Sequence, residues 1–268
     1  MTRFTFATTA ALVTAPLFAG VKIQMENTNL ATNKTTTQVI MLDNTRLRVD
    51  ADEKTSMMFL TDGGMNRMVM LDRTANTYRV MDEQTMKQMA SQVSGAMAQM
   101  EAAMKNMPPE QRAMMEKMMK GKMPQAAAAA PKTVYTAKGS GTVNGFSCTK
   151  YEGVRGTEKV SDICAGSPSQ IKIAPNDFQV FEKMKQFFSG MMDALKDSPF
   201  GSSIQTSSFT EPGFEGFPVQ TVSYKSGKAA DKMELKSVAN TSFSDADFSV
   251  GTAKKMEMPA MGAPGKQR

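Results

Sequence analysis

The sequence contains no histidine, no tryptophan and only two cysteines among its 268 residues. Without imidazole, the chain cannot form a Ser-His-Asp or Cys-His catalytic arrangement or a histidine-based zinc site. The carboxylates are scattered over predicted turns, at positions such as Asp43, Asp62 and Asp72, where solvated turn residues explain them better than catalysis does. We therefore expect no enzyme, no catalytic residue and no cofactor.

Long hydrophobic runs are also missing, because no stretch is apolar over the roughly 20 residues that a membrane-spanning helix needs. Residues 1–19 instead have the features of a secretory signal peptide. Arg3 is their only charge, residues 4–18 are apolar or small, and Ala19 is a small residue before the expected cleavage site. No cysteine follows that could carry a lipid anchor. We expect an exported protein that is soluble in the periplasm.

Methionine is abundant, with 27 residues against nine leucines, so it serves as the general apolar side chain. The net charge of +6, which falls to +5 if Arg3 leaves with the signal peptide, favours weak, transient attraction to an anionic membrane surface. Nucleic acid is not an expected partner, because basic and acidic residues are interspersed and no aromatic-basic motif occurs. The sequence leaves the oligomeric state open.

Residues 83–123 predict a methionine-rich helical hairpin. The spacing of three and four that is typical of one helical face occurs in the first half. Pro108 and Pro109 would end that helix, and a second would follow them. The methionines of the two halves are Met86, Met89, Met97, Met100, Met104 and Met107, and then Met114, Met115, Met118, Met119 and Met123. An alanine-rich linker is expected at residues 124–131.

Short apolar runs separated by turn residues predict an antiparallel sheet on both sides of this hairpin. The expected strands are 21–28, 35–42, 46–51, 55–61, 66–71 and 77–81, then 133–137, 142–151 and 158–164, and finally 218–225 and 232–239. A helix is expected from Pro175 to about Lys196, with an aromatic stripe. Strands 55–61 and 66–71 are apolar on both faces, so the sheet should be covered on both sides, with the hairpin as one candidate cover. The prediction is one α+β domain at residues 20–250 and a disordered basic tail at 251–268.

The two cysteines, Cys148 and Cys164, lie on adjacent predicted strands. A hairpin register centred on Gly156 would place them opposite each other, so a disulfide is geometrically reasonable in an oxidising compartment. Two buried free thiols are the alternative. A redox-active pair is not expected, because no Cys-x-x-Cys motif occurs.

Three segments resemble a known family. They are Met41–Asp50 (MLDNTRLRVD), Met68–Arg73 (MVMLDR) leading into Tyr78, and Val143–Tyr151 (VNGFSCTKY). These motifs resemble the bacterial exported domains of unknown function of family 4412, a family that is similar to the LolA/LolB superfamily of periplasmic lipoprotein carriers. The resemblance implies a curved antiparallel sheet, a LolA-like half-barrel, whose cavity is closed by helices and holds acyl chains in relatives. No active site accompanies the motifs.

The first functional hypothesis is a non-enzymatic periplasmic binding or carrier protein for a lipid, a lipoprotein acyl chain or an apolar peptide segment. A methionine-lined surface can adapt to ligands of different shape. The candidate ligand-binding residues are Met86, Met89, Met97, Met100 and Met104 on the hairpin and Phe181, Met184 and Phe188 on the later helix. The alternative that these residues only pack against the sheet stays open.

The second hypothesis is a Cu(I)- or Ag(I)-binding protein, because thioethers are soft ligands for such ions. Its candidate ligands are Met97, Met100, Met104, Met107, Met114, Met115, Met118 and Met119. The same spacing is also typical of a helical core stripe. A third hypothesis is an envelope stress or structural protein, in which methionine is reversibly oxidised.

Overall fold

A single twelve-stranded sheet organises the computed structural model, which describes residues 20–85, 132–195 and 213–257 together with isolated positions between 87 and 108. The strand order is β12-β6-β5-β4-β3-β2-β1-β11-β10-β9-β8-β7. Neighbours are antiparallel except β12 and β6, which are parallel. The strands are β1 (Gly20–Asn29), β2 (Lys34–Leu42), β3 (Arg46–Asp50), β4 (Thr55–Asp62), β5 (Met65–Asp72), β6 (Thr77–Asp82), β7 (Thr133–Val143), β8 (Phe146–Arg155), β9 (Glu158–Gly166), β10 (Phe217–Lys225), β11 (Lys228–Thr241) and β12 (Lys254–Lys255).

The expected strands are all present, with one error between β7 and β8. The sequence predicted a continuous strand at 142–151, but Asn144 and Gly145 form a turn there, with φ of 48° and 83°. Two consecutive residues with positive φ are typical of the type I′ turns that join antiparallel strands. Residues 142–143 therefore end β7, and β8 begins at Phe146.

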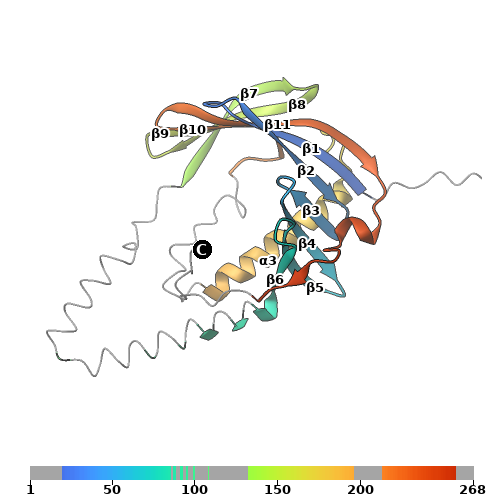
Figure 1. The fold of residues 1–268 in the computed structure, drawn as a ribbon. Coiled ribbons are helices and arrows are strands. Elements are labelled where there is room, and N and C mark those ends of the chain that lie inside the picture. The colour runs from blue at the N-terminus through green and yellow to red at the C-terminus, as the bar shows by residue number, and fades with distance from the viewer. Residues whose placement is uncertain are drawn as a thin grey trace, which may run out of the picture.

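Strand β1 joins the strands β2 to β6 to the strands β7 to β11, because it pairs with β2 on one side and with β11 on the other. Figure 1 shows β1 and β11 side by side and the sheet bending around them, so that the ends of the sheet turn toward the same side. The side chains of Val21, Ile23 and Met25 point to one face of β1 and are fully buried. The centre of this curved sheet is thus the centre of the main core.

A 3-10 turn η1 (Pro175–Phe178) and the helix α3 (Gln179–Leu195) lie on the concave side of the sheet (Figure 1). The helix buries Val180, Met184 and Phe187 in the main core. The Phe187 ring lies 5.7 Å from that of Phe59 in β4, measured between centroids. The helix expected from Pro175 to about Lys196 is therefore confirmed.

The opposite, outer face of β4 and β5 carries a second, smaller core. Met58, Leu60, Val69 and Leu71 pack there against Phe248, which lies in the 3-10 turn η2 (Asp245–Phe248). The expectation that apolar residues on both faces require two covers is thus confirmed for β4 and β5. The described cover of the outer face is the C-terminal segment, whereas most of the predicted methionine hairpin lies outside the described residues.

The C-terminal segment continues the sheet beyond residue 250. Lys254 donates its backbone N–H to the carbonyl of Asn76, and Met256 donates to that of Tyr78, which places β12 beside β6. The first residues of the expected basic tail are consequently part of the sheet, while residues 258–268 lie outside the described chain. Within the described chain, no helix has the length and apolar character to cross a membrane.

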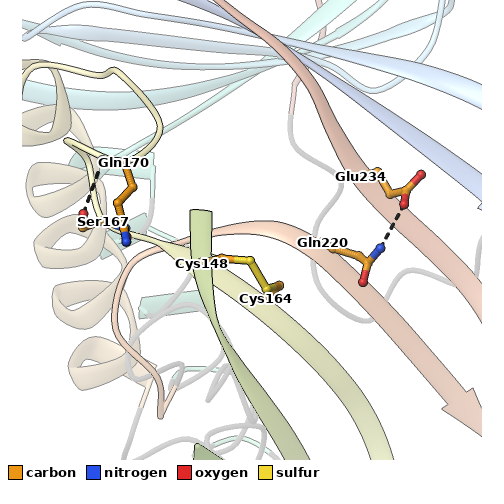
Figure 2. The surroundings of a disulfide bond; sticks show 6 residues. All are labelled: Cys148, Cys164, Ser167, Gln170, Gln220 and Glu234. Atoms are coloured by element: carbon orange, nitrogen blue, oxygen red, sulfur yellow. Dashed lines mark hydrogen bonds between the residues drawn. A yellow bond between two sulfur atoms is a disulfide. The ribbon is translucent and has the colours of Figure 1, made fainter. Parts of the chain in front are cut away.

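Cys148 and Cys164 form a disulfide between β8 and β9, as the sequence predicted (Figure 2). Their register differs from the expected one, because the turn pairs Arg155 with Glu158 and a bulge between Gly153 and Val154 shifts the pairing further. Cys164 lies opposite Lys150, two residues along the strand from Cys148. The two cysteines are diagonal neighbours on one face, with Cα atoms 5.4 Å apart.

Replacing both cysteines by serine should lower the free energy of unfolding by about 3 kcal/mol, because the disulfide closes a loop with a sequence separation of 16 in the unfolded chain. Urea unfolding with and without reductant measures this loss. The doubly substituted protein serves as the control, since reductant should leave its midpoint unchanged. Equal midpoints for the oxidised and reduced wild-type protein would contradict the prediction.

Phe248→Ala should destabilise the protein by about 3 kcal/mol, because the ring is only 5% exposed and anchors the outer core. The C-terminal segment should also become accessible to trypsin at Lys254 and Lys255. Met256→Ala, at a side chain that is 43% exposed, is the matched control and should change stability by less than about 0.5 kcal/mol. A Phe248 variant as stable and as resistant as this control would refute the anchoring role.

Candidate binding face

The concave face of β3 to β6, here called the inner face, carries two rows of side chains that cross the strands. The first row consists of Leu47, Phe59, Met68 and Met81. The second row consists of Val49, Met57, Met70 and Arg79. Because directly paired residues point to the same face of a sheet, each row forms a continuous band.

The two rows differ in their cover. In the first row, Phe59 contacts Phe187 of α3, and Leu47, Phe59 and Met68 are buried. In the second row, Met57 is partly buried and Met70 is 37% exposed. The inner face therefore keeps accessible apolar surface next to the part that packs beneath α3.

Three of the predicted ligand-binding residues lie on α3. Met184 is 9% exposed and belongs to the main core. Phe181 and Phe188 are partly buried and pack against that core, with ring centroids 5.4 Å from Phe178 and 5.9 Å from Phe187, respectively. Packing is thus a clear role of Met184, whereas Phe181 and Phe188 retain some exposure.

The other predicted residues lie outside the described part of the chain. This holds for the hairpin ligand candidates Met86, Met89, Met97, Met100 and Met104, and for the metal candidates Met97, Met100, Met104, Met107, Met114, Met115, Met118 and Met119. Both sets stay predictions. Over the described ranges, no group of three or more Asp, Glu, Cys or His side chains could hold a metal ion.

Arg79 is the charged member of the second row. It pairs with Met70 across β5 and β6, its side chain is partly buried, and its Nε is buried without a hydrogen-bond partner. Unpartnered buried donors are uncommon in folded proteins, because they lose their hydration without gaining an acceptor. This arginine did not stand out in the sequence. Its position two residues before Met81 in the predicted strand could have indicated that the two side chains share a face.

The outer face of the same strands has a different character. Arg46 pairs with Asp43 and Asp245, and its guanidinium lies 4.3 Å from the Phe248 ring centroid. On the neighbouring strand positions, Arg48 and Arg73 both contact Asp50, at 2.8 and 2.9 Å. These arginines of the outer face are therefore matched with carboxylates, and Arg46 and Arg48 hold η2 against β3.

Asp50 is the centre of this outer network. Burial alone would raise the pKa of its carboxyl, but hydrogen bonds from Arg48 and Ser56, together with the charges of Arg48 and Arg73, outweigh burial and lower the pKa below 3.8. The folded state consequently favours ionised Asp50. This carboxylate has a structural role and is not poised for proton transfer near neutral pH.

Asp43 corrects one expectation, because it is buried and not a solvated turn residue. Its carboxylate accepts hydrogen bonds from the backbone N–H groups of Thr45 and Arg46, at 2.9 and 2.7 Å. The nearby Asp177 in η1 has a raised pKa, mainly through burial and also through the charge of Asp43. Asp62 is exposed as expected, but it is the last residue of β4 and lies just before the turn, and Asp72 accepts a hydrogen bond from the backbone of Ala75.

Within the described residues, a large, mainly antiparallel sheet with the packed helix α3 defines an α+β protein of the class that the sequence predicted. The chain belongs to the family described as domain of unknown function (DUF4412), whose match spans residues 76–252. This span covers β6 to β11 together with η2, and it includes the disulfide. No curated protein matches the chain.

Solved structures give only distant similarities. An uncharacterized conserved protein from Thermus thermophilus has 6% identity and a TM-score of 0.42, with 90% of this chain and 92% of that chain covered. PNGF-II has 9% identity and a TM-score of 0.39, with coverage of 90% and 31%, respectively. The MucA/MucB complex of Pseudomonas aeruginosa has 8% identity and a TM-score of 0.34, with coverage of 88% and 57%. At these TM-scores and identities, the similarities assign no function to this chain.

Asp50→Asn should destabilise the protein by about 1–2 kcal/mol at pH 7, because two arginines lose their shared carboxylate. Since the folded-state pKa of Asp50 is lowered, its stabilisation is present above 3.8 and is lost as the pH falls through the lowered value. The difference between wild type and variant in urea midpoint should therefore shrink below pH 3.8. Asp62→Asn, at the exposed end of β4, is the control. A difference that stays constant with pH would contradict the role of the ionised carboxylate.

Proposed function

We propose that the chain is a non-enzymatic, exported binding or carrier protein that accommodates a lipid or another apolar segment on its inner face. The observation that supports this proposal most strongly is Met70, an exposed methionine in a band of inward-pointing apolar residues. A concave apolar surface with an open part is the usual character of a site for apolar ligands. In this proposal the sheet acts as a half-barrel similar to that of the LolA/LolB superfamily.

The chemistry of the second row suits a ligand without a fixed shape. Met57 and Met70 face each other across β4 and β5, and both side chains are unbranched and flexible. An acyl chain that covers them would remove apolar surface from water, at about 25 cal/mol per Å². Such a site would bind long apolar chains in general and would discriminate little among them.

The helical cover is also part of the proposal. Phe181 and Phe188 are partly buried on α3 and are candidate ligand contacts beside the sheet, and the predicted methionine-rich hairpin is a further candidate. The disulfide between Cys148 and Cys164 is compatible with export into an oxidising compartment such as the periplasm. Family membership adds no ligand, since the family has no assigned function.

The test is direct binding of a neutral apolar probe, the methyl ester of a fluorescent C18 tetraene fatty acid, to the purified protein. The chain contains no tryptophan, so the probe emission has no tryptophan background. Met70→Gln should weaken binding by about tenfold, because a polar amide replaces a thioether in the apolar row. The matched control is Met65→Gln, at a side chain that is 73% exposed and lies in the β4–β5 hairpin.

Each outcome decides between the hypotheses. Binding that is weakened by Met70→Gln and unchanged by Met65→Gln supports the proposal. Absence of probe binding, or equal effects of the two variants, contradicts it. A stoichiometric Cu(I) adduct in native mass spectrometry, without probe binding, would instead favour the metal-binding alternative.

A further inference from the structure

The second row of the inner face combines two features that a simple packing surface would not need. Met70 leaves apolar surface accessible, and Arg79, directly opposite on β6, holds a buried Nε that has no hydrogen-bond partner. The two side chains share one face, and directly paired positions in a sheet lie about 5 Å apart. An apolar surface and a cationic donor therefore adjoin each other.

Arg79 differs from the three arginines that are paired with carboxylates on the outer face. Arg46, Arg48 and Arg73 each have a carboxylate within 2.9 Å. Among the described residues, the ion pairs do not include Arg79, and the two acidic residues nearest to it along the chain and across the ladder have other roles. Asp82 is bonded to Thr85 and Asp72 to Ala75.

We propose that Arg79 binds the anionic head group of an acyl lipid whose chain lies over Met70 and Met57. The inference rests on the proposed function and gives it a ligand class, a long-chain amphiphile that ends in a carboxylate or phosphate. A guanidinium presents N–H donors in a planar fork that matches two oxygens of such a group. The buried Nε gains its missing acceptor, and the acyl chain covers the exposed methionine.

The direction of the ligand follows from the position of Arg79 in the sheet. Among the described strands, β6 is next to last in the strand order, and the two-residue strand β12 lies beyond it. The head group thus lies near this edge of the described sheet. The chain runs from there across β5 and β4, toward the interior of the concave face.

The experiment compares two probes on the purified protein, the fluorescent C18 tetraene fatty acid and its methyl ester. We expect the acid to bind at least about tenfold more tightly than the ester to the wild type at pH 8, where the acid is ionised. Arg79→Gln should bring the acid to the affinity of the ester, and Arg79→Lys should retain part of the preference. Arg67→Gln is the matched control, because Arg67 is exposed and points to the outer face, opposite Leu60.

A second variant protects the test against misfolding. Arg79→Met removes the unpartnered donor and keeps an unbranched side chain as far as the position of Nε, so we expect a melting temperature equal to or above that of the wild type. A lower melting temperature together with an unchanged preference for the acid would assign Arg79 a structural role and overturn the proposal. Sodium acetate at millimolar concentration should not displace the acid probe, and displacement would indicate a site for small anions in place of an amphiphile.

The failure of this inference is distinguishable from that of the proposed function. If both probes bind with equal affinity to the wild type, the apolar site stands and the role of Arg79 is wrong. If the acid preference persists in Arg79→Gln, or falls equally in Arg67→Gln, the role of Arg79 is also wrong. If neither probe binds, both proposals fail.

Discussion

The structure depends on one constraint, which is that β4 and β5 carry apolar side chains on both faces. Met58, Leu60, Val69 and Leu71 face outward, while Phe59 and Met68 face inward. A sheet with two apolar faces is stable in water only when both are covered. Residues 243–253 cover the convex side, and α3 covers the first row of the concave side, whereas Met70 of the second row stays exposed.

The outer cover illustrates how polar groups stabilise a small apolar contact. Phe248 provides the buried ring, Arg46 lies over that ring, and Arg48 donates a hydrogen bond to the carbonyl of Asp247. Each interaction is modest alone, and a cation–π contact contributes on the order of 1 kcal/mol. Together they fix a 3-10 turn that buries too little apolar surface to hold itself in place. The neighbouring β12 then adds backbone hydrogen bonds to β6.

The strands and α3 could be predicted from the sequence, because both follow from the local period of apolar residues. The disulfide could be predicted from two cysteines on neighbouring strands, but its register could not, since the bulge at Gly153 leaves no signal in the apolar pattern. The turn that divides the predicted strand 142–151 could have been predicted from Asn144-Gly145, because this dipeptide is a strong turn signal. Long-range pairings such as β1 with β11 were inaccessible, because nothing local to either strand specifies the partner. For the same reason Asp43 looked like a solvated turn residue until the fold buried it.

The residues of the candidate site could be predicted from the sequence even less well than the strand pairings. The sequence directed attention to methionine stripes on helices, and one described member, Met184, is a core residue. The open apolar surface instead lies on strands, where Met57, Met70 and Arg79 meet only through cross-strand pairing. Within the described ranges, the arginines that hold the C-terminal segment on the convex side are partnered, whereas the buried Nε of Arg79 on the concave side is not. A buried donor without an acceptor beside uncovered apolar surface costs stability, and a ligand that is apolar along its length and anionic at one end removes both parts of that cost.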